Sequence, residues 1–420
     1  MLDHFKIIDT GTESLGTTFF HTDRIRRYKF ARNAINFLSS ITNGSNKAER
    51  MQIDWTLVQR IGIFCQWGIG DAILMIPLLK SFRKVSNAKI ELIGKPWLRE
   101  LFLSSNICDY VHICVPPWTK FKKKYFFWHS EWRKYLCRLK SLRTIQFDLL
   151  ISIRYDPREI LQLRLLDSRI RAAYSACGGR PWLNIDFGVN PSMAQMRHVT
   201  YDATLAAEIL TNQKTDAMPL LNVPPQNLRR SCKWLRNNGY RDGIILTVSP
   251  GSGNSIRRWP DNSYTKVLED LPMSVGFVVV IVPPEENDKL DIKWPSPIPG
   301  AYWRGTLIDL QGILSVTDIL LTVDSGVMHI GAACGCHIVA IFGPQLKQWF
   351  RPNTIKSEII MEDSMPCRPC FDKCIYEIPI CMKHIKEDTV KEAVHRAAKK
   401  ISVPRINSFY HSMALENFQP

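Results

Sequence analysis

The sequence predicts an α/β protein built on parallel sheets. Residues 60–83, 244–260 and 316–344 each begin with a short apolar strand that runs into a turn containing Gly and Ser or Asp. Bare apolar runs of this length are typical of parallel strands that are buried on both faces. Repeated alternation of strands and helices favours the α/β class. At 420 residues, the chain is long enough for two domains of ordinary size.

The first strand and helix are expected within residues 60–83. The strand, residues 61–65, is followed by Gly70 and Asp71 and then by apolar residues at helical spacing. Pro77 falls inside that helix, which is a costly position unless the chain bends there. The glycines here resemble only a fragment of the GxGxxG dinucleotide fingerprint, which is a weak signal. A simple helix N-cap is the alternative role of Asp71.

The second junction follows a strand at residues 244–248 and reads SPGSGNSIRRWP. Glycines such as Gly253 permit close approach of a ligand to the backbone, and Ser252 offers a hydroxyl. Arg257 or Arg258 supplies a fixed cation for a phosphate. The loop is not a Walker A motif, because no GKS or GKT follows it. An ordinary turn between a strand and a helix is the alternative.

The third junction follows the strand at residues 319–323. Asp324, Ser325 and Gly326 open a helix whose small residues at 331–333 allow it to lie close to a sheet. The N–H groups at such a helix start, together with the helix dipole, attract an anion such as a phosphate. His329, one turn into the helix, would face the same crevice. The alternative is that Asp324 only caps the helix.

Together the three segments resemble glycosyltransferase family 9, the ADP-heptose:lipopolysaccharide heptosyltransferases. The matching motifs occur in family order between about residues 60 and 390: GD-x5-P (Gly70, Asp71, Pro77), PG-x-G…RxWP (Pro250, Gly251, Gly253, Arg257, Trp259, Pro260) and DSG-x2-H…FGP (Asp324, Ser325, Gly326, His329, Phe342, Gly343, Pro344). One residue departs from the family pattern, because Arg257 stands where the family usually has Lys. The charge is kept and a two-pronged contact with phosphate becomes available.

The resemblance implies the GT-B fold, in which two Rossmann-like domains face each other across a cleft that holds the active site. We place the acceptor domain at residues 61–220 and the nucleotide-sugar domain at residues 221–385, with a proline-containing linker at residues 219–225. Residues 1–60 form an extension that the family pattern does not explain. Residues 386–420 are expected to form a helix, which packs back on the first domain, and a polar tail.

The resemblance also implies catalytic roles. Asp71 is the expected general base, a function that typically contributes about 10² to 10⁴ in rate. Arg257 and the N–H groups after Asp324 would stabilise the departing diphosphate in place of a divalent metal, since no DxD motif stands out. The expected donor-binding residues are Gly70, Ser252, Gly253, Glu285 (or Glu286, on the ribose), Asp324, Ser325, Gly326 and His329. Arg154 and Arg158 would meet an acidic acceptor or, alternatively, lie on a solvated helix face.

The function implied is inverting, metal-independent transfer of heptose or a similar sugar from ADP-heptose to a lipopolysaccharide core or related glycan, with no cofactor for catalysis. A relative acting on protein hydroxyls is one alternative. A non-catalytic protein on the same fold, or a basic module that binds membranes or nucleic acid, are the others. No single residue identifies the sugar or the acceptor.

Positive charge is concentrated in this chain, whose formal net charge is +16. Residues 118–143 interleave Lys and Arg with aromatics and hold a single acid, Glu131. Such a segment suits anionic head groups, so we expect an acidic glycolipid acceptor and peripheral contact with the cytoplasmic face of the inner membrane. A helical hairpin with core aromatics is the alternative, and nucleic acid is the least favoured partner.

The N-terminal extension carries a second basic segment. Residues 24–41 could form a basic amphipathic helix, and we favour packing on the enzyme over membrane contact. No apolar h-region follows the start, and no apolar run reaches the roughly 18 to 20 residues of a spanning helix. The expected location is therefore cytoplasmic.

Twelve cysteines raise the question of metal binding. Eight are scattered and are expected to be buried thiols, as in a reducing cytoplasm. The remaining four are clustered: Cys367, Cys370, Cys374 and Cys381. Four thiolates at this spacing could hold a structural zinc or iron, and disulfides and free thiols are the alternatives. The resemblance adds that some protein-directed heptosyltransferases hold iron through cysteines.

Overall fold

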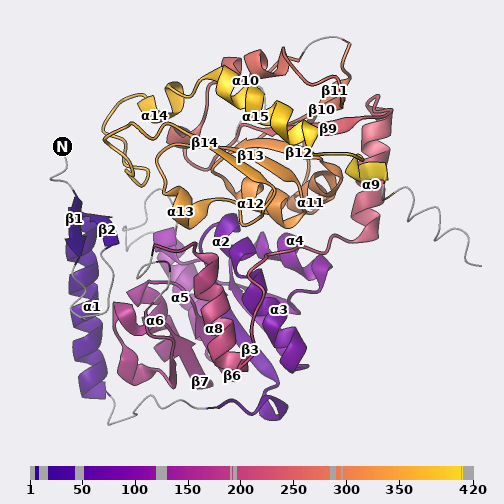
Figure 1. Cartoon of the computed structure of the whole chain (residues 1–420). Coiled ribbons are helices and arrows are strands. Elements are labelled where there is room, and N and C mark those ends of the chain that lie inside the picture. Colours follow the sequence, from indigo (N-terminus) through magenta and orange to yellow (C-terminus); the bar gives the residue numbers. More distant parts are fainter. Residues whose placement is uncertain are drawn as a thin grey trace, which may run out of the picture. The chain divides into compact units, whose positions relative to one another are not determined.

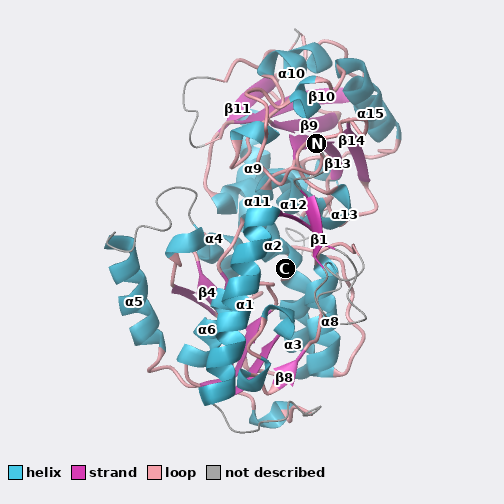
Figure 2. Ribbon diagram, turned by 90° about the vertical axis from the view of Figure 1, so that its left-hand side faces the viewer, coloured by secondary structure: helices cyan, strands magenta, loops and turns pink. Residues whose placement is uncertain are grey.

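The computed structural model describes residues 5–8, 18–42, 52–119, 130–189, 192, 196–283, 290–294, 297–407 and 409. The chain divides into two compact units, Met1–Ala217 (unit 1) and Met218–Pro420 (unit 2), each built around a six-stranded sheet (Figure 1). A short antiparallel pair, β1 (Phe5–Ile8) and β2 (Thr18–His21), precedes the first sheet. Helices flank both sheets, so the predicted α/β class is confirmed (Figure 2).

The sheet of unit 1 is parallel throughout and has the order β5-β4-β3-β6-β7-β8. Its strands are β3 (Arg60–Cys65), β4 (Lys89–Gly94), β5 (Tyr110–Ile113), β6 (Phe147–Ser152), β7 (Ser168–Ala173) and β8 (Ile185–Asp186). The chain runs outward from β3 to one edge and then returns to β6 on the other side of β3. This is the Rossmann order, in which ligands bind outside the carboxyl ends of the two central strands.

Unit 1 contains the helices α1 (Thr22–Thr42), α2 (Ile69–Leu74), α3 (Ile76–Val85), α4 (Leu98–Phe102), α5 (Ser130–Leu142), α6 (Pro157–Leu165) and α8 (Thr200–Thr211). The bend expected at Pro77 is present. Helix α2 ends before Met75, and Pro77 lies in the first turn of α3. An N–H group in the first turn has no partner within the helix, so proline is tolerated there.

Helix α1 forms over the segment predicted to be helical, and one of its faces packs on unit 1. Ile35 is buried in the core of that unit, and the N–H of Gly179 donates to Asn36 Oδ1 at 3.1 Å. Phe30 and Phe37 remain largely exposed, at 78% and 67%.

Helix α5 contains the described part of the basic, aromatic segment. Trp118 contacts the rings of Trp132 and Tyr135, with centroids 5.8 and 5.2 Å apart. Tyr135, Leu139 and Leu142 are buried in the core of unit 1. In the described part of the segment the aromatics therefore belong to the core, whereas residues 120–129 lie outside the described residues.

Unit 2 repeats the same topology with the order β11-β10-β9-β12-β13-β14, again parallel throughout. Its strands are β9 (Ile244–Ser249), β10 (Val275–Ile281), β11 (Gly300–Trp303), β12 (Ile319–Val323), β13 (His337–Phe342) and β14 (Ser357–Met361). Its helices are α9 (Pro225–Asn237), α10 (Asp261–Leu268), α11 (Leu307–Val316), α12 (Gly326–Ala333), α13 (Lys347–Phe350), α14 (Ile380–Lys383) and α15 (Glu387–Lys399). The two central strands are β9 and β12.

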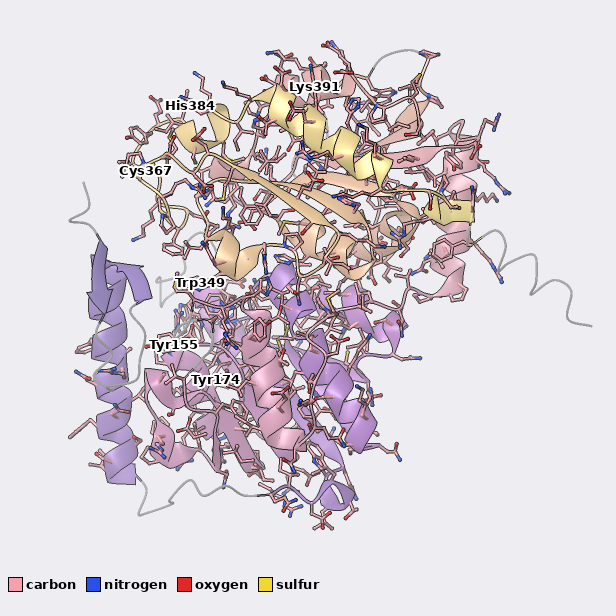
Figure 3. The ribbon with its side chains drawn as sticks, viewed as in Figure 1. Tyr155, Tyr174, Trp349, Cys367, His384 and Lys391 are labelled. Carbon is pink, nitrogen blue, oxygen red and sulfur yellow. The ribbon has the colours of Figure 1, made fainter. Side chains whose placement is uncertain are left out.

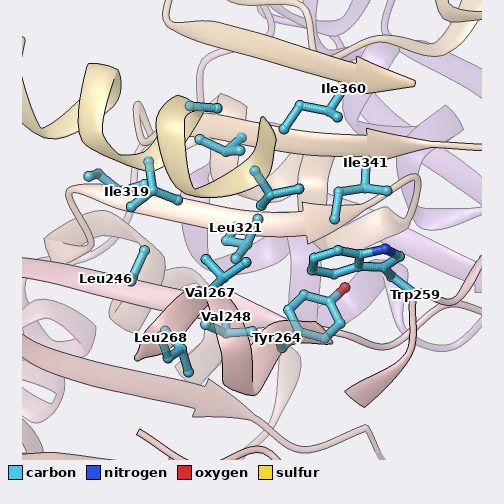
Figure 4. Close-up of a cluster of buried hydrophobic side chains, with 14 of the residues drawn as sticks. Leu246, Val248, Trp259, Tyr264, Val267, Leu268, Ile319, Leu321, Ile341 and Ile360 are labelled. Carbon is cyan, nitrogen blue, oxygen red and sulfur yellow. The ribbon is translucent and has the colours of Figure 1, made fainter. Parts of the chain in front are cut away.

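The C-terminal helix α15 completes the core of its own unit. Val390 and Val394 are fully buried with residues of the sheet, and Figure 4 shows this helix lying over the strands that carry Ile319 and Ile341. The expectation that this helix packs back on the first domain is therefore wrong. Its apolar residues recur at helical spacing and bury against the sheet that directly precedes it in the chain.

Small residues bring α12 close to the same sheet. A Cβ atom added at Gly331 would lie 2.4 Å from Leu320 Cδ2, so no larger residue fits there without movement. The start of α12 is thereby fixed next to the carboxyl end of β12. Within the described part of the chain, no helix is both long and apolar enough to cross a bilayer.

Candidate functional site

In unit 2, two of the predicted motifs meet at the carboxyl ends of the central strands. The loop containing Ser252 and Gly253 follows β9 and leads into a short 3₁₀ helix, η7 (Ser255–Arg257). Asp324 and Ser325 follow β12, the neighbour of β9. The strand order reverses between these two strands, which is where open α/β sheets bind their ligands.

Arg257 is the charged centre of this site. Its Nη1 donates to Asp324 Oδ2 at 3.1 Å, and its Nε donates to Asp372 Oδ1 at 2.7 Å. Its Nη2 makes a further short contact with Asp372 Oδ2. The Asp324 side chain is buried, whereas those of Arg257 and Asp372 are 24% and 22% exposed. The structure thus brings Arg257 and Asp324 together and adds a second carboxylate, which the sequence analysis did not identify.

The helix start beside Arg257 is capped by Ser325. Its Oγ accepts the Met328 N–H at 3.4 Å, so the simple capping role considered for Asp324 is wrong. The backbone of Asp324 is fixed instead, because its N–H donates to Ile341 O at 3.2 Å and its carbonyl accepts the Ser252 hydroxyl at 3.4 Å. Gly326 is the first residue of α12, where helical N–H groups lack partners within the helix. His329 lies buried one turn further along α12.

The two glycines of the β9 loop differ in their surroundings. A Cβ atom added at Gly251 would lie 2.6 Å from Pro283 Cγ, whereas one added at Gly253 would meet no atom of the described residues within 4 Å. Close packing against Pro283 therefore explains why residue 251 is glycine, whereas no such contact explains the glycine at residue 253. The space beside Gly253 is open to a ligand. Trp259, at the end of the loop, is buried and packs edge-on against Tyr264 at 5.0 Å (Figure 4).

In unit 1, Asp71 lies on α2 at the carboxyl end of β3. Its Oδ2 accepts the Gly68 N–H at 2.9 Å, and its Oδ1 accepts Arg154 Nη1 at 2.6 Å. Arg154 follows β6, the other central strand, so the pair bridges the point where the strand order reverses. Each carboxylate oxygen has more than one acceptor position, so these two bonds leave capacity for a further proton donor. Gly70 immediately precedes Asp71 in α2.

Two arginines stack on aromatic rings beside Asp71. The guanidinium carbons of Arg154 and Arg158 lie 5.3 and 5.8 Å from the centre of the Trp67 ring, and that of Arg158 lies 5.2 Å from Trp118. Arg158 also donates to both carboxylate oxygens of Asp156, at 2.8 and 2.6 Å. These cations are held in place by rings and carboxylates, unlike side chains on a freely solvated helix face.

Glu159 is a buried acid beside this cluster that the sequence analysis did not identify. It is fully buried, accepts Trp67 Nε1 at 2.7 Å and is bonded to the Ser152 hydroxyl at 2.5 Å. Burial, reinforced by the nearby Asp156 carboxylate, raises the pKa of Glu159 to about 7. The sequence gives no sign of this burial, because Ser152 at the end of β6 and Trp67 after β3 come next to Glu159 only in the fold.

The raised pKa of Glu159 predicts a pH-dependent effect on stability. The folded protein keeps a proton on this group from its ordinary pKa of 4.5 up to about 7, so the residue lowers the free energy of unfolding as pH rises through that window. We expect Glu159→Gln to be more stable than the parent by up to about 3 kcal/mol at pH 8, with the difference vanishing near pH 4.5. Urea unfolding across this range measures it. The exposed Glu269→Gln serves as control, and a gain that does not vary with pH would contradict the assignment.

The predicted ribose contact, Glu285 or Glu286, lies outside the described residues. The four clustered cysteines are described, and all are free thiols. Cys367 lies on the loop between β14 and α14 (Figure 3), which also carries Cys370 and Cys374. Cys381 is buried in α14.

These cysteines do not form the predicted zinc or iron site. Among the described residues, no three or more His, Cys, Asp or Glu side chains come together in a way that could hold a metal ion. The Arg368 guanidinium interacts electrostatically with the thiols of Cys367, Cys370 and Cys381. Burial, with a smaller effect of the neighbouring thiols, raises the pKa of Cys370 to about 11, so this thiol is protonated at neutral pH in the absence of a metal. The spacing in the sequence did not reveal this fixed positive charge.

Comparison with known proteins places these features in a family. The model of "Glycosyltransferase family 9 (heptosyltransferase)" matches residues 138–378. The match includes Arg257, Asp324 and Asp372, whereas Asp71 precedes it. Lipooligosaccharide heptosyltransferase 2 of Campylobacter jejuni is 26% identical over 192 residues, covering 43% of this chain and 57% of that protein. The chain therefore spans less than two thirds of that relative's length.

Solved structures share the fold. The glycosyl transferase family 9 protein of Veillonella parvula has a TM-score of 0.64 and 18% identity, covering 84% of this chain and 99% of that protein. The E. coli ADP-heptose lps heptosyltransferase II has a TM-score of 0.61 and 15% identity, covering 81% and 99%. The expected GT-B fold is thereby confirmed. Because the family model covers more than half of the chain, this protein belongs to glycosyltransferase family 9, the heptosyltransferase family.

Proposed function

We propose that this protein is an inverting, metal-independent glycosyltransferase that moves a heptose or similar sugar from ADP-heptose to a lipopolysaccharide core or related glycan. The observation that carries the proposal is the Arg257–Asp324 pair at the carboxyl ends of β9 and β12, beside the start of α12. Membership of the family and the activities named for its relatives support the choice of a nucleotide sugar.

The donor diphosphate would bind in unit 2. Arg257 offers a planar fork of N–H donors, and the first N–H groups of α12 add the positive end of a helix dipole. The open space at Gly253 allows a phosphate to approach the β9 loop, where Ser252 offers a hydroxyl. Asp324 holds Arg257 in position and is close enough to the fork to reach the donor sugar. These groups stabilise the charge that develops on the departing diphosphate, which is the work a divalent metal does elsewhere.

The acceptor hydroxyl would be activated in unit 1. Asp71 takes the proton as the acceptor oxygen forms its bond to the anomeric carbon, and the electron pair of the breaking carbon–oxygen bond leaves with the diphosphate. A single displacement of this kind inverts the anomeric configuration. Arg154 orients the Asp71 carboxylate through its contact of 2.6 Å.

The acceptor would be acidic. Arg154 and Arg158, stacked on Trp67 and Trp118, present two fixed guanidinium groups beside Asp71, and such groups suit phosphate or carboxylate. A phosphorylated glycolipid at the cytoplasmic face of the inner membrane has this chemistry. The net charge of +16 favours peripheral association with such a surface.

A two-step experiment tests the proposal. Thermal-shift measurements against ADP-, UDP-, GDP- and CMP-sugars should single out the ADP-sugars, and ADP release should then require both ADP-heptose and a truncated lipopolysaccharide core. Transfer of the sugar to a protein hydroxyl would show that the proposed acceptor is wrong and that the reaction is still glycosyl transfer. Absence of both binding and nucleotide release across the panel would refute the proposal.

A further inference from the structure

Carboxylates contact the guanidinium of Arg257 on two sides. Asp324 accepts a hydrogen bond from Nη1 at 3.1 Å. Asp372 contacts the edge formed by Nε and Nη2: Nε donates to Oδ1 at 2.7 Å, and Nη2 contacts Oδ2. This second contact is the parallel two-oxygen arrangement that a phosphate also makes with arginine. A diphosphate can therefore gain the Nε–Nη2 edge of Arg257 only by displacing Asp372.

The two carboxylates differ in how firmly they are held. Asp324 is buried, and its backbone is tied to β13 and to the β9 loop through Ile341 and Ser252. Asp372 lies on the loop between β14 and α14, with its side chain 22% exposed. Releasing Asp372 moves a carboxylate toward solvent, whereas releasing Asp324 would leave a charge buried without its cation. Asp372 is the carboxylate that a phosphate displaces more easily.

The loop around Asp372 is attached firmly on its N-terminal side. Arg368 donates to the carbonyls of Gly343 at 2.5 Å and Glu362 at 2.8 Å, and the Phe371 N–H donates to Pro344 O at 3.1 Å. Beyond that anchor, Phe371 and Asp372 adopt left-handed φ values of 49° and 66°. Non-glycine residues occupy this region only at an energetic cost, so contacts such as the Arg257 pair are needed to hold it.

We propose that Asp372 is a positioning residue of the donor site: its carboxylate holds the phosphate-binding edge of Arg257 in the absence of ligand, and the donor diphosphate displaces it. The displacement frees the part of the loop beyond Phe371, which carries Cys374. This inference rests on the proposed function, because it requires that Arg257 bind the diphosphate. The position of the cysteine-containing loop then depends on whether a donor diphosphate is bound to Arg257.

Calorimetric titration with ADP tests the competition. Asp372→Asn keeps the size of the side chain and removes the competing charge, so we expect it to bind ADP about tenfold more tightly than the parent. Asp388→Asn is the matched control, because Asp388 is largely exposed and pairs with Lys391 on α15 rather than with Arg257. Its affinity for ADP should equal that of the parent.

The outcomes separate the inference from the function on which it rests. If the parent binds ADP and Asp372→Asn binds it equally or more weakly, then Asp372 does not compete and the inference fails while the proposed function stands. If neither protein binds ADP or an ADP-sugar, the proposed donor site itself fails. Unfolding midpoints of both variants show whether any loss of affinity comes from a loss of folding.

Alkylation of the loop thiols tests the displacement independently. Iodoacetamide labelling of Cys374, a partly buried thiol beyond the anchored part of the loop, followed by mass spectrometry, should become several-fold faster when ADP is added to the parent. In Asp372→Asn the labelling should be fast without ADP. Cys137, an exposed thiol on α5, provides the internal control in the same sample. Labelling of Cys374 that ADP leaves unchanged or slows would overturn the proposed displacement.

Discussion

Asp71→Asn should lower the rate of sugar transfer by about 10² to 10⁴ while leaving the Kd for ADP within twofold of the parent. Asparagine keeps an oxygen for Arg154 or for the Gly68 N–H, so the fold around it should persist. The amide cannot accept the proton of the acceptor hydroxyl, so turnover is lost while donor binding in unit 2 is retained. Single-turnover transfer together with calorimetric ADP binding measures both quantities.

The control for Asp71 is Asp167→Asn, which makes the same chemical change at an exposed position of unit 1. It should transfer sugar at the parental rate. Full turnover by Asp71→Asn would remove Asp71 from the role of base. An equal loss in kcat and in ADP affinity would assign it to binding instead.

Arg257→Ala should weaken ADP binding by at least tenfold and reduce kcat/KM by about 10² or more, since the same fork binds the ground-state diphosphate and stabilises its departure. Arg257→Lys should recover part of both effects, because it keeps the charge but loses the two-pronged geometry. Kinetics over a range of ADP-sugar concentrations separate the two effects. Arg241→Ala, an exposed arginine of unit 2, is the matched control.

Stability must be checked alongside, because Arg257→Ala also leaves the buried Asp324 carboxylate without its cation. We expect a loss of about 1–3 kcal/mol in the free energy of unfolding. If the variant remains folded and its kinetics match the parent, Arg257 makes no phosphate contact.

The fold followed largely from local patterns in the sequence. Apolar runs gave the strand Ile319–Val323 and, to within a residue at one end, the strands β3 and β9. The resemblance to the family added that there are two such sheets. The sequence also indicated that Arg257 and Asp324 lie close together. Each motif comes directly after a strand, and parallel strands end at the same edge of a sheet. Capping was harder to predict, since Asp324 and Ser325 are both good N-caps and local sequence does not choose between them.

Contacts between distant segments were not predictable. Asp372 lies 115 residues from Arg257 in sequence, and nothing in the spacing of the cysteines indicates that the residue between two of them points at an arginine. The same spacing suggested a metal site, yet Arg368 brings a positive charge among the thiols. Glu159 owes its raised pKa to burial, with a smaller effect of the Asp156 carboxylate, whereas the hydrogen bonds with Ser152 and Trp67 lower it, and that burial arises only in the folded protein.

The most direct test of the central claim is a crystal structure of the protein with ADP or an intact ADP-sugar. The account predicts that diphosphate oxygens lie within hydrogen-bond distance of the Arg257 guanidinium and of the N–H groups at the start of α12, with the β9 loop against the phosphates at Gly253. A nucleotide bound elsewhere, with Arg257 still bonded only to Asp324 and Asp372, would contradict it.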